Sequence, residues 1–551
     1  MEAIYAQSQP PDSGAILREL EKQEPKLTRE AVVVSYEPSE TKKAKKGETI
    51  FIKGFKFTGA KVLSETELNK LLKGFIGRDV DVTELDTATT KIVECYVKKG
   101  YVAKVIVPPQ EIKDGIVEIS IIIGQLEGYT TSKEKTRFNK NRAIRIINNA
   151  QGKNKIITIS NLEKGLLLIN DIPGVKAIST VHPGKKEAGV LVDLDIKDNP
   201  LVNANIGYDD YGIHSTGTQR MTAALSFNDP FSIGDQIYGS FIYTGLMGYE
   251  SLTYSLPIGY SGMRGGLSSS HLHYRLGKEF SYLQGKGGAF TIGPYLSWPL
   301  IRSCLKNVYV LANFFHKNFK NELSGNIIND KKADVGNIYL NVDAYDKFCG
   351  GGYTSSGLGF SLGNLNLEGN QGSYALDQTG PGTSGIYSKF SFFTSRIQYI
   401  TEKTSLNLKL NGQLALHNLD SSEQFSLGGP DGVRAYSTGD ANGDHGFVAT
   451  AELSRVLWNE VKVSGFYDFG YIIQHYKTYA GSNGAIGKNS YALDSVGIGV
   501  MWTPSKVKWF VVKASGAVSA AFSNSGIINL HDFGVGIGRN SCIFVQAAAI
   551  I

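Results

Sequence analysis

The sequence predicts a mainly β protein, a transmembrane antiparallel β-barrel preceded by a short helix and two small α/β modules. Two observations support this prediction. The composition changes near residue 199: residues 1–199 hold 32 basic and 27 acidic side chains, whereas residues 200–551 hold only 25 and 24. Across the same boundary Tyr plus Phe rise from 10 to 44 and Gly rises from 15 to 48. The hydrophobic pattern also changes there, from alternating helical and strand segments to a sustained period of two.

The overall composition excludes several classes of protein. The 551 residues are too many for one compact domain, and they are too apolar and aromatic for a disordered chain. The net charge of +6 is small and spread out, so no nucleic-acid partner is expected. Four cysteines are too few for a disulfide scaffold; we expect four unlinked thiols, with a Cys304–Cys349 pair as the alternative. No apolar run of about 18 residues predicts a transmembrane helix, and residues 1–5 show no signal peptide, which leaves a cytosolic chain or a nearby processing point open.

The first 49 residues predict a helix and a linker. Residues 11–24 begin with Pro11, offer Asp12 or Ser13 as the N-cap, and place three apolar side chains on one face. We assign residues 1–30 to this helical segment. Residues 31–49 are assigned to a linker, because the stretch 37–49 contains no large apolar residue.

Two α/β modules are predicted next, at residues 50–128 and 129–198. In the first, a strand precedes helices that open at Ser64 and Thr83, each followed three residues later by a carboxylate that completes a capping box. The second repeats the plan, with a basic helix at 138–149 and a helix that opens at Ser160. Each module ends in a helix, a strand, a turn and a strand. No catalytic residue pattern occurs in either module, and a generic α/β domain is the alternative to an adaptor surface.

Residues 199–551 predict the barrel. The segment 405–417 shows the clearest alternation, with five leucines on one face and Asn, Lys, Gln and His on the other. The same alternation occurs at 251–256, 271–276 and 496–502. A soluble sandwich would show this pattern too, but aromatic residues lie near the segment ends, as in membrane girdles. Sixteen strands would leave about 22 residues for each strand and its connection, which suits a strand of ~10 residues that crosses a membrane.

Motifs that would indicate an enzyme, a nucleotide or a metal are weak. Residues 380–385 match G-x-G-x-x-G, but they contain a proline and lack a strand–helix context. Residues 440–446 resemble a calcium loop with a misplaced glycine, so a polar turn is favoured. His271 and His273 share a strand face and could bind a metal, although we favour polar side chains that face the barrel lumen. We therefore expect no enzyme, no cofactor and no metal.

One segment stands out in the predicted barrel. Residues 427–436 hold three glycines and one arginine, Arg434, in a region poor in charge. Further along, the strand 461–470 carries Asp468 on its polar face. An arginine brought inward on a glycine-rich hairpin could pair with this carboxylate in a partly hydrated interior. The alternative is an extracellular loop and an unrelated lumen acid.

These residues give the chain a resemblance to the outer-membrane transporters of two-partner secretion (the TpsB type, haemolysin and adhesin secretion). The resemblance covers nearly the whole chain: helix, linker, two POTRA-like units and a barrel that has 16 strands in that family. The family's V-R-G-Y/F tetrad corresponds to Val433-Arg434-Ala435-Tyr436, with alanine in place of the glycine. Its wall motif corresponds to Gly465 through Asp468 to Gly470. The resemblance implies that Arg434 and Asp468 lock a loop at about 427–446 inside the barrel.

The resemblance also implies a function. The POTRA-like units would capture an unfolded secreted partner in the periplasm. The barrel, surrounded by the lipid of the bacterial outer membrane, would export this partner without nucleotide. The first helix would plug the pore at rest. The partner would be a large β-helical haemolysin or adhesin. Capture by strand addition is expected along the edge formed by Tyr101, Ala103, Val105 and Val107. An assembly factor that inserts barrels into the outer membrane is the alternative function.

Overall fold

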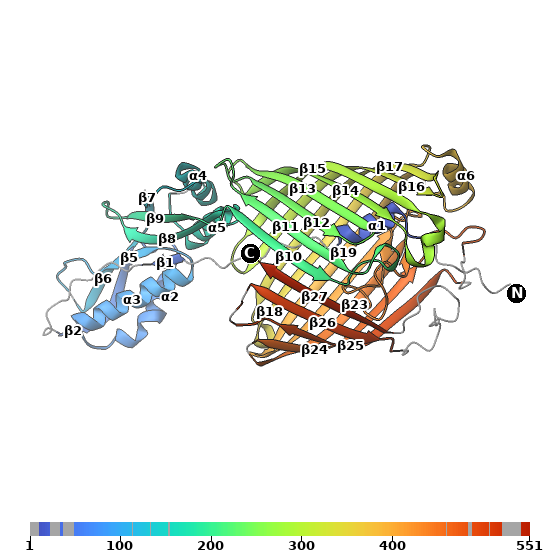
Figure 1. The fold of residues 1–551 in the computed structure, drawn as a ribbon. Helices are drawn as coiled ribbons and strands as arrows, with labels where there is room; N and C mark the ends of the chain where they lie inside the picture. Colours follow the sequence, from blue (N-terminus) through green and yellow to red (C-terminus); the bar gives the residue numbers. More distant parts are fainter. Residues whose placement is uncertain are drawn as a thin grey trace.

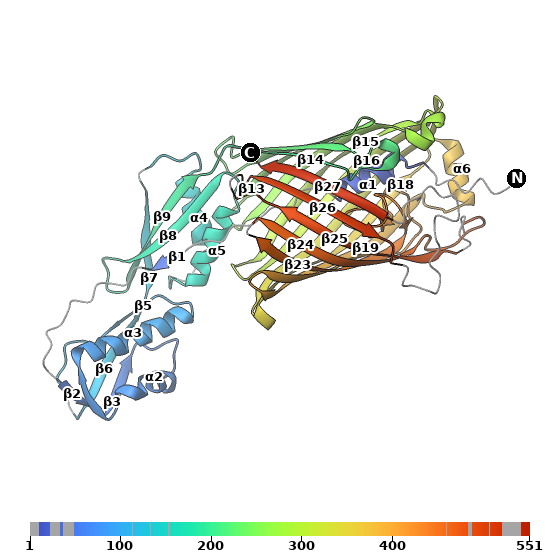
Figure 2. The same cartoon turned by 60° about the horizontal axis from the view of Figure 1, so that its bottom comes forward.

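A computed structural model describes residues 10–22, 34–36, 49–112, 114–132, 134–152, 155–458, 460–482, 488–505, 507, 509–520 and 541–550. Figures 1 and 2 show two α/β modules extending from one end of a β-barrel that contains a helix. Most of the predicted linker 31–49 lies outside the described residues. None of the helices in these ranges is long and apolar enough to cross a membrane.

The helices lie mainly in the amino-terminal part of the chain. They are α1 (Ser13–Glu21), α2 (Glu65–Leu72), α3 (Val82–Lys98), α4 (Lys140–Gln151), α5 (Ile159–Asn170) and α6 (Gln371–Thr379), with short 3₁₀ helices η1 (Lys73–Phe75), η2 (His214–Thr216), η3 (Lys278–Leu283) and η4 (Phe348–Gly350). The strands outside the barrel wall are β1 (Val34–Tyr36), β2 (Thr49–Ile52), β3 (Gly54–Thr58), β4 (Arg78–Asp81), β5 (Ala103–Ile106), β6 (Ile116–Ile123), β7 (Gln125–Thr131), β8 (Val175–Pro183), β9 (Gly189–Asp198), β21 (Phe425–Ser426) and β22 (Asn442–Gly443).

The two α/β modules have the same topology, as the sequence repeat predicts. In the first, β3 is parallel and β5 antiparallel to the central strand β6. In the second, β7 is parallel and β8 antiparallel to β9. The helices α2 and α3 pack on one face of the first sheet, and α4 and α5 contribute to the core of the second.

Three local features of this region differ from the prediction. Helix α3 is capped by Asp81, whose box partner is Glu84, and not by Thr83. Helix α5 is capped by Thr158, with no reciprocal bond from Glu163. Within the predicted linker, β1 pairs in parallel with the edge of β8, because its backbone can satisfy the open hydrogen-bonding groups of that strand.

The second module contacts the barrel directly. Arg302 at the end of a barrel strand donates to both oxygens of Asp171, at 2.7 and 2.8 Å. Arg142 of α4 donates to the Pro257 carbonyl in the same rim. This end of the barrel therefore faces the modules.

The barrel is a closed antiparallel sheet of sixteen strands, which confirms the predicted fold class. Its last strand pairs with its first, so the sheet has no open edge. The strands are β10 (Val202–Asp209), β11 (Arg220–Asn228), β12 (Gln236–Tyr243), β13 (Met247–Ile258), β14 (Met263–Arg275), β15 (Lys286–Arg302), β16 (Lys306–Leu323), β17 (Asn326–Asp346), β18 (Gly352–Asn366), β19 (Gly385–Thr401), β20 (Thr404–Ala415), β23 (His445–Trp458), β24 (Val461–Ile473), β25 (Ser490–Trp502), β26 (Phe510–Val518) and β27 (Ser541–Ile550).

The apolar faces of the alternating segments point outward from the barrel, except on β14. Leu408 and Leu414 on β20, like Ile498 on β25, are exposed on the outer wall. On β14, however, the prediction for His271 and His273 is wrong. Leu272 and Tyr274 are the residues that face the lumen, where they pack against α1, so the two histidines point outward. The apolar face of this strand faces inward because the lumen holds an apolar helix face instead of water.

Candidate functional site: the helix and loop inside the barrel

Helix α1 is short and amphipathic, and its apolar face holds it inside the barrel. Ile16, Leu17 and Leu20 pack in one buried cluster with apolar side chains of the lumen wall, including Leu272 and Phe319. Asp12 caps the helix and accepts from the backbone N–H of Ala15 at 2.9 Å. The N-cap, one of two that the sequence offered, is therefore settled as Asp12.

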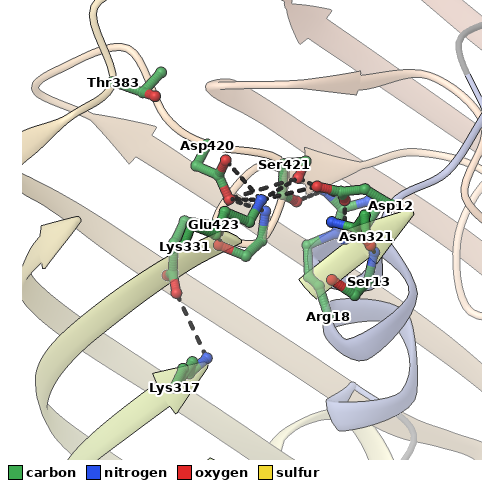
Figure 3. A network of polar contacts seen from close by, with 12 residues as sticks. Asp12, Ser13, Arg18, Lys317, Asn321, Lys331, Thr383, Asp420, Ser421 and Glu423 are labelled. Carbon is green, nitrogen blue, oxygen red and sulfur yellow. Dashed lines mark hydrogen bonds and ion pairs between the residues drawn. The ribbon is translucent and has the colours of Figure 1, made fainter. Parts of the chain in front are cut away.

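The start of α1 is held by a buried ion-pair network (Figure 3). The ammonium of Lys331, on β17, lies 2.8 Å from Asp12 Oδ2 and 2.7 Å from Asp420 Oδ1. The Ser421 hydroxyl donates to the other oxygen of Asp12 at 2.7 Å. The Lys331 side chain is 0% exposed, so these two carboxylates supply the negative charge that balances its buried ammonium. Burial by itself would raise the pKa of Asp12, but Lys331 and the hydrogen bonds lower it to about 2.

Further along, α1 bonds to the loop that follows β20. Arg18 donates to the Ser421 carbonyl at 2.7 Å and to Asn442 Oδ1 at 2.8 Å. Glu19 accepts from the Ser426 hydroxyl at 2.7 Å. Burial raises the pKa of Glu19, but the charges of Lys22 and Arg18 outweigh this effect and lower the pKa to about 2. The polar face of α1 thus contacts both the loop and polar side chains of the wall, while its apolar face packs against the wall.

A second cation on the wall sits below this network. Lys317 of β16 lies 3.4 Å from Glu21 and 3.5 Å from Glu423. Lys389 of β19 lies 2.8 Å from the same Glu423. Burial raises the pKa of Glu423, and the two ammonium groups lower it to about 2. Asp12 and Glu423 are therefore ionised at neutral pH and paired with wall lysines.

The predicted inward loop is folded into the lumen. Its base is the hairpin of β21 and β22, and Leu427, Val433 and Ala435 are fully buried in a cluster with wall residues such as Phe466. A Cβ on Gly470 would lie 2.9 Å from Val433 and 3.1 Å from Leu427, so only glycine lets the loop seat there without a shift. A Cβ on Gly465 would meet nothing within 4 Å, so this second glycine of the wall motif has no such role.

The structure brings Arg434 and Asp468 together. Arg434 donates from Nε and Nη2 to the two oxygens of Asp468, each at 2.9 Å, and its backbone N–H donates to Oδ2 at 3.2 Å. Asp468 is 0% exposed and also accepts from the hydroxyls of Thr450 and Ser495. The guanidinium carbon lies 3.2 Å from the ring centroid of Phe466. This is a bidentate, stacked pair, the geometry for which arginine is suited and lysine is not.

Arg434 has a further partner that sequence reasoning missed. Its Nη1 donates to Glu452 Oε2, on β23, at 2.9 Å. Two other residues of the tetrad also anchor the loop: Val433 is buried, and the Tyr436 hydroxyl donates to the Ser519 hydroxyl at 3.3 Å. Ala435, which replaces the family glycine, has no positive φ. The loop therefore adopts its inward conformation without a glycine at this position.

The predicted capture edge is only partly available. Strand β5 pairs with β6 alone in its sheet. Ala103, Val105, Val107 and Tyr101 contribute side chains to the module core, and Tyr101 also forms a bridge with Thr158 of the second module. The open backbone edge is therefore the stretch 103–106. The outward side chain in its middle is Lys104, which the sequence reasoning did not select.

Comparison with known proteins places these features in a family. Residues 190–498 match the family described as haemolysin secretion/activation protein ShlB/FhaC/HecB, and residues 50–124 match a POTRA domain of ShlB type. The chain belongs to this secretion/activation family. The resemblance to two-partner secretion transporters is thereby confirmed, and the family consists of transporters.

Individual relatives agree. The heme/hemopexin transporter protein HuxB of Haemophilus influenzae (strain 86-028NP) is 29% identical over 445 residues, 79% of this chain and 78% of HuxB. The outer membrane transporter CdiB of Dickeya dadantii is 21% identical, covering 76% of this chain and 75% of CdiB. The solved structure of CdiB from Escherichia coli has the same fold, with a TM-score of 0.66 at 19% identity, covering 93% of each chain.

Family membership fixes the orientation of this transporter. The barrel lies in the outer membrane, and the POTRA modules at one end lie in the periplasm. The end of the barrel distant from the modules therefore faces outward from the cell.

Proposed function

We propose that this chain exports an unfolded partner protein through its barrel after α1 leaves the lumen. The observation that supports the proposal is how α1 is held. Its contacts are shared between a short apolar stripe and ion pairs such as Asp12–Lys331. Ion pairs can be exchanged for water when the helix moves, whereas a wholly apolar seat would leave a large dry surface behind. The helix is thus a removable part of the lumen.

Space for an extended chain already exists beside α1. A cavity of about 630 Å³ is lined by Leu20 of α1, by Arg434 and by wall residues that include Lys409 and Asp209. Its lining is mixed in charge and polarity, which suits passage of a polypeptide without a fixed sequence. Removing α1 would join this cavity to the space that the helix fills.

Recognition in the periplasm is assigned to the open edge of β5. The corresponding strand of the second module, β8, has its outer edge covered by β1, whereas β5 has no second strand partner among the described residues. An unpaired edge offers backbone donors and acceptors to an extended segment of any sequence. The edge at 103–106 is therefore the better site for strand addition.

The pair of Arg434 and Asp468 is assigned to fixing the inward loop during transport. A bidentate pair with a buried carboxylate holds the loop in one place more firmly than apolar contacts alone. The assembly-factor alternative shares such a loop, and the family match with secretion proteins favours export.

The class of the partner is proposed from what the relatives transport. They include transporters of heme/hemopexin and of hemolysin. We assign to this chain a large secreted partner of the haemolysin or adhesin class; the adhesin alternative and the β-helical fold of the partner are carried over from the resemblance to two-partner secretion. The test is co-expression of this chain with each candidate secreted protein encoded by the genes adjacent to its own. Export into the medium that requires this chain supports the function. Insertion of barrel proteins that depends on this chain, with no export, would instead favour the assembly factor.

A further inference from the structure

A cluster of possible metal ligands lies on the outer wall of the barrel. Glu250 is on β13, and His271 and His273 are on β14. Glu250 pairs across the strands with His271, and Gly248 pairs with His273. Because Leu272, between the histidines, packs in the lumen, all three ligand side chains project from the opposite, outer face.

The distances within this cluster fit one ion. One ligand atom from each residue lies within 4.8 Å of the other two. His271 Nδ1 and Glu250 Oε2 are 3.4 Å apart. Zinc bonds to nitrogen and oxygen of about 2.0–2.1 Å place two ligands of a tetrahedron about 3.4 Å apart. One edge of a tetrahedral site is therefore already formed, and a small rotation of the second imidazole would complete three ligands.

Gly248 leaves room for the ring of His273 over the adjacent strand β13. A Cβ on Gly248 would lie 2.3 Å from His273 Cε1, so the ring of His273 occupies space that only a glycine leaves on β13. The rings of His271 and His273 have centroids 5.8 Å apart at an angle of 31°. Two histidines at positions i and i+2 of a strand, with a carboxylate on the adjacent strand, converge on one point by the geometry of the sheet alone.

We propose that Glu250, His271 and His273 form a surface site for a divalent transition-metal ion of the Zn²⁺ class. Two imidazole nitrogens and one carboxylate oxygen match Zn²⁺, Cu²⁺ or Ni²⁺, whereas Ca²⁺ and Mg²⁺ require mainly oxygen ligands. The exposed position of the cluster leaves a fourth coordination place for water or an external ligand.

The site lies near the outer end of the barrel. Strand β13 starts at Met247 and runs toward the turn at Gly262, where a Cβ would lie 2.4 Å from Leu168 of the second module. Glu250 is therefore close to the end distant from the periplasm. Its row of cross-strand neighbours includes the exposed Phe241 and Phe290, which mark an aromatic band at the membrane boundary. Zn²⁺ bound there would join β13 to β14 and be accessible from outside the cell.

The test uses the full chain, purified in detergent without a polyhistidine tag and stripped with EDTA. Zn²⁺ is titrated against a chromophoric chelator, and Co²⁺ absorption reports the ligand geometry. We expect one Zn²⁺ per chain, with affinity reduced about 100-fold or more in the double variant H271A/H273A and about 10-fold in Glu250→Gln.

The matched control is H316A/D334A. This pair also lies on the wall, with His316 Nδ1 2.7 Å from Asp334 Oδ1, but it supplies only two ligands. Its removal should leave Zn²⁺ affinity unchanged. Heat-modifiable migration on gels verifies that each variant is a folded barrel. Absence of Zn²⁺ binding by the wild-type chain, or equal binding by H271A/H273A, would overturn the proposal.

Discussion

Replacement of Lys331 by methionine should release α1 from the lumen. Methionine keeps the length and the apolar stem of lysine but removes the charge that Asp12 and Asp420 share. With α1 seated, the two carboxylates would then face each other without a cation. Departure of α1 removes Asp12 from this pair, so the substitution destabilises the seated state more than the released state.

The size of the effect follows from the burial of the pair. Removing one partner of a buried ion pair costs about 3–5 kcal/mol. Asp12 keeps the Ser421 hydroxyl and the Ala15 N–H, and the Asp12 side chain is 23% exposed, so we expect about 2–3 kcal/mol. That free energy lowers the ratio of seated to released helix about 30- to 150-fold.

Single-channel recording in planar bilayers measures this ratio, because a released helix opens the pore. We expect K331M to spend far more time in high-conductance states than the wild type. Lys332→Met is the matched control, since Lys332 is the next residue on the same strand and is exposed on its other face. If K331M forms a folded barrel whose conductance equals that of K332M and the wild type, the Lys331 network does not hold the helix.

Four further predictions test the other parts of the site. Deleting residues 1–30 should raise single-channel conductance as K331M does, and an unchanged conductance would remove the plug role from α1. Arg434→Ala should reduce partner export at least 10-fold while the barrel remains in the membrane, and normal export would exclude the lock. The swap R434D/D468R should restore export only together with Glu452→Gln, because Glu452 lies 2.9 Å from the Arg434 guanidinium and would repel a carboxylate; rescue without E452Q would contradict this geometry. Because Asp12 and Glu19 have pKa values lowered to about 2, the stability that they give the seated helix is complete above their ordinary values of 3.8 and 4.5 and is lost only as the pH falls toward 2. Burial raises the pKa of Asp440 in the loop to about 7, so its protonation as the pH falls can only favour the seated state. Conductance should therefore not rise as the pH falls from 8 to 5, and a rise within that range would show that other groups hold α1.

The barrel and the modules could be predicted because their signals are local. Alternation of side chains along β20, or the carboxylate three residues after Ser64, requires only neighbouring positions. The pairing of Arg434 with Asp468 came from a family motif and from the scarcity of charge around it. The residues that form each of these features lie within about 40 positions of one another in the sequence.

The contacts that hold α1 in the lumen could not be predicted, because they join residues that are far apart in the sequence. Asp12 and Lys331 are 319 residues apart, and no periodic pattern relates a lysine on β17 to a helix cap. The predicted orientation of His271 was wrong for a related reason. The alternation is present, but whether the apolar face of the strand points outward or into the lumen depends on whether water or α1 occupies the lumen at that height. A correct prediction required knowing first that the lumen is filled there.

The contacts of α1 indicate that the plug and the inward loop are one coupled unit. Arg18 bonds to Ser421 before the β21–β22 hairpin and to Asn442 within it, and Glu19 bonds to Ser426. The same loop carries Arg434, whose carboxylate partner is on the wall. A contact that α1 makes only with the inward conformation stabilises that conformation, and by linkage the inward loop stabilises seated α1 by the same free energy. Departure of the helix therefore weakens the hairpin base and leaves the Arg434–Asp468 pair as the main polar attachment of the loop. A simple surface ion pair would be too weak for this role, which explains why the pair is bidentate, stacked and buried.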